Sequence, residues 1–268
     1  MGLLAAALLG VVQGLTEFLP VSSSAHLILA RLFFGWDAAA FGVAFDVACH
    51  LGTVVAILIF FRADFAAMRR ALPQAFSRRP GRDGRRLQLL AIGTVPIVIV
   101  GLTLAHWLEA TTRTPVIAAT ALMVGAGVFF VVERMGSQRT GEDGLSPSGA
   151  FAIGIAQCLA LVPGVSRSGA TIAMGMALGL ARPAAARFTF LLSVPAILAA
   201  AAKEGLELRH AALGSRDLAM FGVGMLSSAV VGYLTVRFFI AYLSGHRLDV
   251  FAWYRVGLAL VTFAWLAR

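Results

Sequence analysis

Charged residues and cysteines are both scarce in this 268-residue chain. Charged side chains make up 13% of it and apolar side chains 59%, and the only cysteines are Cys49 and Cys158. Two cysteines in apolar surroundings do not make a disulfide framework, so packing is their expected role. The apolar runs recur at lengths near the roughly 20 residues that cross about 30 Å of hydrocarbon. The sequence therefore predicts a polytopic membrane protein.

Acidic residues are few as well, which leaves a net charge of +9. A basic protein of this kind could bind nucleic acid, but eight arginines lie between Arg62 and Arg86, in one loop between two apolar runs. Such a loop is typical of the cytoplasmic face of a membrane protein, so we expect no nucleic-acid partner. The first twelve residues lack a basic segment and run on into Gln13 and Glu17, which argues against a cleaved signal peptide.

Six apolar runs are long enough to span a bilayer, and the expected fold class is an all-α membrane protein. The runs cover residues 41–61, 89–108, 115–132, 184–202, 218–240 and 250–267. Two further pairs of shorter runs, 3–19 with 23–35 and 149–162 with 167–181, are interrupted by proline. Each pair is predicted to form a re-entrant helical hairpin, whose irregular tip must be covered by protein or a water-filled cavity.

The two interrupted pairs carry nearly the same polar pattern, 144 residues apart. The first reads QGLTEFLPVSSSAH over residues 13–26, and the second reads QCLALVPGVSRSGA over residues 157–170. This is an internal duplication, with repeats at about 1–132 and 149–268 inside one membrane domain spanning 1–268. Polar groups at such depth are costly and usually functional, so one site should be built from both copies.

The number of crossings sets the direction of each hairpin. If the loop 62–88 lies on the cytoplasmic side (inside), the first hairpin enters the membrane from the outside. The second hairpin follows three crossings later and therefore enters from the inside. The two repeats are therefore predicted to be inverted, an architecture most familiar from transporters. The loops 133–148 and 241–249 should also lie inside, with 109–114 and 203–217 outside.

The first copy contains the residues best suited to chemistry. Gln13 and Glu17 are four residues apart and project from one face of a helix. Glu17 could hold Mg²⁺ or Ca²⁺, handle a proton, or simply hold the hairpin together. The second copy has Leu161 at the corresponding position, which favours a functional role for Glu17 over a purely structural one.

Three consecutive hydroxyls follow the proline of the first copy. Capping of a helix would explain one of Ser22, Ser23 and Ser24. With His26 one turn further on, they supply a hydroxyl nucleophile within potential reach of an imidazole base. His26 alone would more simply be a core histidine, and the neighbouring Glu17 and serines are what favour catalysis.

The second copy has the composition of an oxyanion cradle. Its glycines permit close backbone approach, its hydroxyls donate hydrogen bonds, and the amides at a helix start attract anions. Arg167 adds a planar fork that matches phosphate oxygens, or neutralises Glu17 in a buried pair, and both can hold. The predicted cradle residues are Gly164, Ser166, Ser168, Gly169 and Thr171. Asp46, His50, Arg187 and Arg255 also lie in predicted spans, and their roles are left open between the cavity and structural pairing.

The motifs at residues 13–26 and 163–171 resemble the two signatures of the bacterial undecaprenyl-diphosphate phosphatase family, also called the bacitracin-resistance protein family. The resemblance covers essentially the whole chain. It implies a multi-pass inner-membrane enzyme that removes the terminal phosphate of undecaprenyl diphosphate and so recycles the lipid carrier for wall polymers. It further implies a divalent cation, Mg²⁺ or Ca²⁺, and an active site open to the periplasm.

Carried over by position, the resemblance implies four catalytic residues, Glu17, Ser23, His26 and Arg167, with Glu17 also binding the metal. Around the phosphates it implies Gln13, Ser22, Ser24, Gly164, Ser166, Ser168, Gly169 and Thr171. Many members have glutamate where this chain has Gln13, which weakens a metal site with two carboxylates. Members often have Thr-Gly where this chain has Ser24-Ala25.

The sequence is therefore compatible with two functions. The first is a phosphatase in which either Ser23 or water, with His26 as base, attacks the outer phosphorus of a polyprenyl diphosphate. The second is a transporter or flippase for a phospholipid carrier or another anion, since inverted repeats with half-helix starts serve transport equally well. The oligomeric state is open, with a homodimer as one option.

Overall fold

The computed structural model describes the whole chain except residues 1, 37–41, 78, 136–138 and 209–213. Within the described residues the chain is helical, and strand-like pairing is limited to one bridge between Thr140 and Leu180. The expected all-α class is confirmed.

In the described part of the chain, six helices are long and apolar enough to cross a membrane. They are α3 (Val43–Phe60), α5 (Arg82–Thr112), α6 (Pro115–Val132), α9 (Arg182–Leu208), α10 (Ser215–Leu243) and α11 (Asp249–Leu266). Each contains one of the six predicted runs almost entirely, and α5, α9 and α10 extend several residues beyond them. The chain is thus a multi-pass membrane protein.

Two pairs of shorter helices correspond to the interrupted runs. The first pair is α1 (Leu3–Phe18) and α2 (Ser23–Phe34), and the second is α7 (Pro147–Cys158), extended by the short η2 (Leu159–Leu161), and α8 (Arg167–Ala177). The breaks fall at residues 19–22 and 162–166, as the prolines predict.

The two breaks share an unusual backbone conformation. Ser22 and Ser166, which correspond in the duplication, have φ angles of 73° and 70°, and they are the only non-glycine residues with positive φ in the described chain. A positive φ is disfavoured for serine and persists only where the surrounding structure enforces it. Each serine directly precedes the helix that follows its break.

The first helix of each pair packs on a long helix from the other half of the chain. Gly10 of α1 lies against the backbone of Gly224 in α10, and Gly154 of α7 lies against Gly93 in α5, so closely that a Cβ at either position would overlap the facing carbonyl. Gly10 and Gly154 correspond in the duplication. Small residues at these crossings let the helix backbones approach closely.

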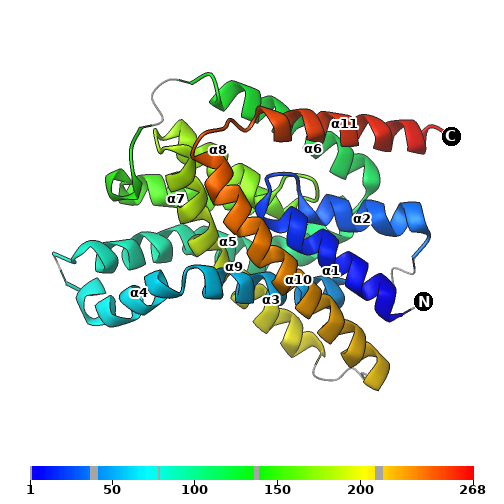
Figure 1. The fold of residues 1–268 in the computed structure, drawn as a ribbon, viewed down its shortest axis with the longest axis horizontal. Coiled ribbons are helices and arrows are strands. Elements are labelled where there is room, and N and C mark those ends of the chain that lie inside the picture. The colour runs from blue at the N-terminus through cyan, green and yellow to red at the C-terminus, as the bar shows by residue number, and fades with distance from the viewer. Residues whose placement is uncertain (1, 37–41, 78, 136–138, 209–213) are drawn as a thin grey trace.

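A network of ion pairs joins α4 (Arg62–Ala75) to α5, to α9 and to the short η1 (Glu142–Gly144). Arg86 donates to Asp64 and to Glu142, each at 3.1 Å, and Arg187 pairs with the same two carboxylates. Figure 1 shows α4 at the left, opposite the two chain ends at the right. Arg187, one of the residues left open above, is therefore placed in a structural network.

Candidate active site

The two duplicated motifs meet in space. Ser168, in the first turn of α8, donates a hydrogen bond to the carbonyl of Leu19 at 3.2 Å. Arg167, at the start of the same helix, forms an ion pair with Glu17 near the end of α1. Residues about 150 positions apart in sequence thus form one polar centre, and the pairing of Arg167 with Glu17 considered from the sequence is present.

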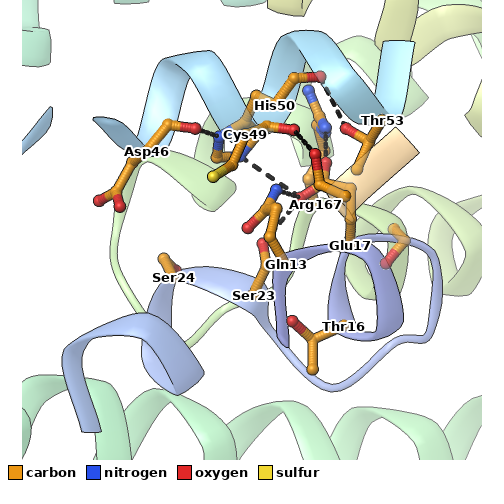
Figure 2. A network of polar contacts seen from close by, with 12 residues as sticks. Gln13, Thr16, Glu17, Ser23, Ser24, Asp46, Cys49, His50, Thr53 and Arg167 are labelled. Atoms are coloured by element: carbon orange, nitrogen blue, oxygen red, sulfur yellow. Dashed lines mark hydrogen bonds and ion pairs between the residues drawn. The ribbon is translucent and has the colours of Figure 1, made fainter. Parts of the chain in front are cut away.

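Glu17 is the hub of this centre (Figure 2). Its carboxylate accepts hydrogen bonds from Gln13 Nε2 at 2.8 Å and from Ser23 Oγ at 2.8 Å. His50 of α3 brings Nε2 to 3.3 Å from Oε2, and the guanidinium of Arg167 completes the set. Glu17 is only 7% exposed, so these four donors compensate a charge that would otherwise be costly to bury.

A cavity of about 320 Å³ opens from this hub. One part of its wall is polar and is formed by Glu17, Ser22, Ser23, Ser24, His50, Gln157, Ser166 and Arg167. The other part is mostly apolar and is formed by α3, α5 and α9, including Val47, Leu102 and Ile197, and Lys203 and Glu204 of α9 also line the cavity. A cavity with an arginine and hydroxyls in one part and aliphatic walls in the other fits an amphiphile with an anionic head.

The two ring nitrogens of His26 contact groups other than the Ser23 hydroxyl. Its Nδ1 lies 2.7 Å from the carbonyl oxygen of Ser22, and its Nε2 lies 2.7 Å from the hydroxyl of Tyr254 in α11. The two rings stack with an angle of 5° between their planes. Both ring nitrogens are therefore engaged elsewhere, and the structure does not bring His26 to the Ser23 hydroxyl as the sequence spacing suggested.

Several residues of the predicted cradle hold the backbone of the second break and the start of α8 in place. Ser166 Oγ accepts a hydrogen bond from the Gly169 amide N–H at 3.1 Å, so the Ser166 side chain caps the start of α8. Thr171 Oγ1 donates to the carbonyl of Arg167 at 2.7 Å and is buried. Gly164 has a φ of 96° and shapes the turn, and Ser24 Oγ lies 3.2 Å from Ser22 Oγ. The cavity itself is lined by the serines at positions 22–24 and 166 and by the arginine at position 167.

Two further residues belong to the site, and sequence reasoning assigned neither. His50 was left open, and its Nδ1 lies 2.7 Å from the carbonyl of Asp46, which aims Nε2 at Glu17. Gln157 was given no role. It lines the cavity, is 0% exposed, and neither of its amide atoms has a hydrogen-bond partner among the described residues. Its correspondence to Gln13 in the duplication was the signal that could have identified it.

The carboxylate of Asp46, one of the residues whose role was left open between the cavity and structural pairing, forms structural ion pairs. It lies between the guanidinium groups of Arg31 and Arg113 and pairs with both. These pairs tie α2 and the loop after α5 to α3. Asp46 therefore contributes to the site through its backbone carbonyl, which orients His50.

The donor set near Glu17 suits a cation that shares its ligands with a substrate. Within the described part of the chain no three His, Cys, Asp or Glu side chains cluster as a metal cage. Glu17 offers a carboxylate, and the amide oxygen of Gln13 is buried with no hydrogen-bond partner in the part of the chain that the structure describes. Mg²⁺ is commonly held by one or two protein oxygens together with phosphate oxygens, so these residues fit such an ion.

Comparisons with known proteins agree over nearly the full length. Residues 6–261 match the family model described as bacitracin resistance protein BacA. A protein of Rubrobacter xylanophilus named undecaprenyl-diphosphatase is 45% identical over 98% of both chains. Relatives of the same name from Desulforudis audaxviator and Acidovorax ebreus are 43% and 40% identical, over 96% and 98% of this chain and 96% and 95% of theirs. The chain belongs to the bacitracin resistance protein BacA family.

Proposed function

We propose that this chain is a membrane phosphatase that hydrolyses the terminal phosphate of undecaprenyl diphosphate. The products are undecaprenyl phosphate, the carrier reused in wall synthesis, and inorganic phosphate. The observation that carries the proposal is that Ser23 and Arg167 both contact the Glu17 carboxylate and both line a cavity with polar and apolar walls. The names of the relatives favour this reaction over transport.

Arg167 holds the diphosphate head. Its guanidinium pairs with Glu17 and can turn from that carboxylate to the oxygens of an incoming phosphate, which it matches as a fork. The hydroxyls of Ser22, Ser24 and Ser166 supply further donors from the wall of the cavity. The unpartnered amide of Gln157 completes the set, since a buried amide without a partner gains most from a polar ligand.

Ser23 is the nucleophile in this proposal. Its Oγ attacks the outer phosphorus, its proton passes to Glu17 Oε2, and the bond from phosphorus to the bridging oxygen breaks to release undecaprenyl phosphate. Water then attacks the phosphoserine and frees inorganic phosphate. The 2.8 Å bond between Ser23 and Glu17 supports the proton transfer. His26 is a positioning residue in this proposal. Its contacts with the carbonyl of Ser22 and the hydroxyl of Tyr254 hold the start of α2, which carries Ser23, against α11.

A divalent cation, Mg²⁺ or Ca²⁺, completes the proposed site. Glu17 and the amide oxygen of Gln13 would hold it together with oxygens of the diphosphate. When bound, it would offset the negative charge that builds up on the phosphates during transfer.

We further propose that the two halves of the chain are inverted repeats in the inner membrane and that the site opens to the periplasm. The arginine-rich segment at residues 62–86 and the opposite positions of α4 and the two chain ends in Figure 1 support this orientation.

Cysteine labelling tests the orientation. In a background without Cys49 and Cys158, single cysteines replace Arg79 or Arg268, both of which are exposed. In intact spheroplasts, a membrane-impermeant thiol reagent is expected to label position 268 and to leave position 79 unlabelled until the membrane is opened. The reverse pattern would place the site on the cytoplasmic side.

The activity itself is tested with purified protein in detergent. Given a polyprenyl diphosphate and Mg²⁺, it is expected to release one inorganic phosphate per lipid and to leave the monophosphate intact. Absence of phosphate release, together with movement of the lipid between leaflets of proteoliposomes, would support the transporter instead.

A further inference from the structure

Arg255 in α11 is the most deeply buried charged residue among those that the structure describes. Its side chain is 0% exposed. Its guanidinium donates to backbone carbonyls of three segments. The acceptors are Leu122 and Ala121 in α6, both at 3.2 Å, Pro20 in the first break at 3.3 Å, and Gly164 and Val165 in the second break at 3.0 and 3.1 Å. The ring of Phe129 lies against its other side, 5.3 Å away.

We propose that Arg255 is a positioning residue that fixes the two helix breaks relative to each other and thereby sets Ser23 against Arg167. This inference rests on the proposed function. The reacting groups lie on opposite breaks, with Glu17 and Ser23 flanking the first and Arg167 directly after the second. One guanidinium spans both turns from the side of α11, so its place determines how the two motifs meet.

Physical chemistry explains why an arginine occupies this position. A broken helix at membrane depth exposes carbonyls that no water can satisfy, and each costs free energy unless it finds a donor. A buried guanidinium in turn requires hydrogen-bond acceptors, since it carries five N–H donors and a positive charge. A lysine has three donors at one point and cannot reach three segments in this way.

Gly125 makes room for the guanidinium. A Cβ at this position of α6 would overlap Nη2 of Arg255, whereas a Cβ at Gly127, two residues further along the same helix, would meet no described atom within 4 Å. Alanine is a better helix former than glycine at both positions. Gly125→Ala and Gly127→Ala are therefore a matched pair that differs in the contact with Arg255.

The test measures kcat and amide hydrogen exchange in Arg255→Lys, Gly125→Ala and Gly127→Ala, each purified as folded protein. We expect kcat to fall about tenfold or more in the first two, because small misplacements of reacting groups are costly, and to stay near wild type in Gly127→Ala. In Arg255→Lys and Gly125→Ala, amide hydrogen exchange is expected to accelerate in residues 19–26 and 162–170 and to be unchanged elsewhere.

The outcomes separate positioning from general stability. Folded Gly125→Ala with wild-type kcat and exchange would overturn the proposal. So would global unfolding of Gly125→Ala while Gly127→Ala folds, since the contact would then serve the fold as a whole. Absence of phosphate release from the unmodified protein would instead defeat the proposed function, and the exchange measurement would still report whether Arg255 joins the two breaks.

Discussion

Replacing Ser23 with alanine is expected to lower the rate of phosphate release by about a thousandfold or more, because the substitution removes the atom that forms the bond to phosphorus. Binding of the diphosphate should be largely retained, since Ser23 is one of several donors around the cavity. The measurements are single-turnover phosphate release and equilibrium binding of a non-hydrolysable polyprenyl diphosphate analogue.

Ser24→Ala is the matched control for this substitution. Ser24 also lines the cavity, but its hydroxyl bonds to Ser22, whereas the hydroxyl of Ser23 bonds to Glu17. Loss of one neutral hydrogen bond should cost less than about tenfold. If both variants are equally mild and only Glu17 variants are inactive, water is the attacking group.

Arg167→Lys is expected to be nearly as damaging as Arg167→Ala, with kcat/KM lowered by about a hundredfold or more in each. A lysine keeps the charge but loses the planar fork that can leave Glu17 and take two phosphate oxygens together. Steady-state kinetics on a polyprenyl diphosphate measures the effect, and Arg237→Lys, at an exposed arginine of α10, is the control. Near-normal turnover in Arg167→Lys would reduce Arg167 to a structural counter-ion of Glu17.

The sequence predicted the helices and the breaks because those features depend on local pattern. Six long apolar runs became six long helices, and Pro20 and Pro163 mark the two interruptions. The duplication also predicted that both breaks form one site, and the contacts of Glu17 with Arg167 and of Leu19 with Ser168 are of that kind.

Side-chain direction could not be predicted in the same way. The spacing of His26 from Ser22 and Ser23 allowed a contact with a hydroxyl, but the ring takes a backbone carbonyl and a tyrosine of α11. Arg255 could have lined the cavity or paired with an acid, and its real partners are carbonyls whose orientation exists only in the folded turns. Both outcomes depend on how α11 packs, which no local pattern encodes.

The stereochemistry at phosphorus tests most directly the claim that Ser23 of one motif attacks a phosphate held by Arg167 of the other. The substrate is a polyprenyl diphosphate whose terminal phosphorus is made chiral with sulfur and oxygen isotopes, and the product is analysed for configuration. Each in-line transfer inverts the phosphorus. Attack by Ser23 followed by attack of water on the phosphoserine predicts overall retention, whereas overall inversion would show a single direct attack by water and contradict the account.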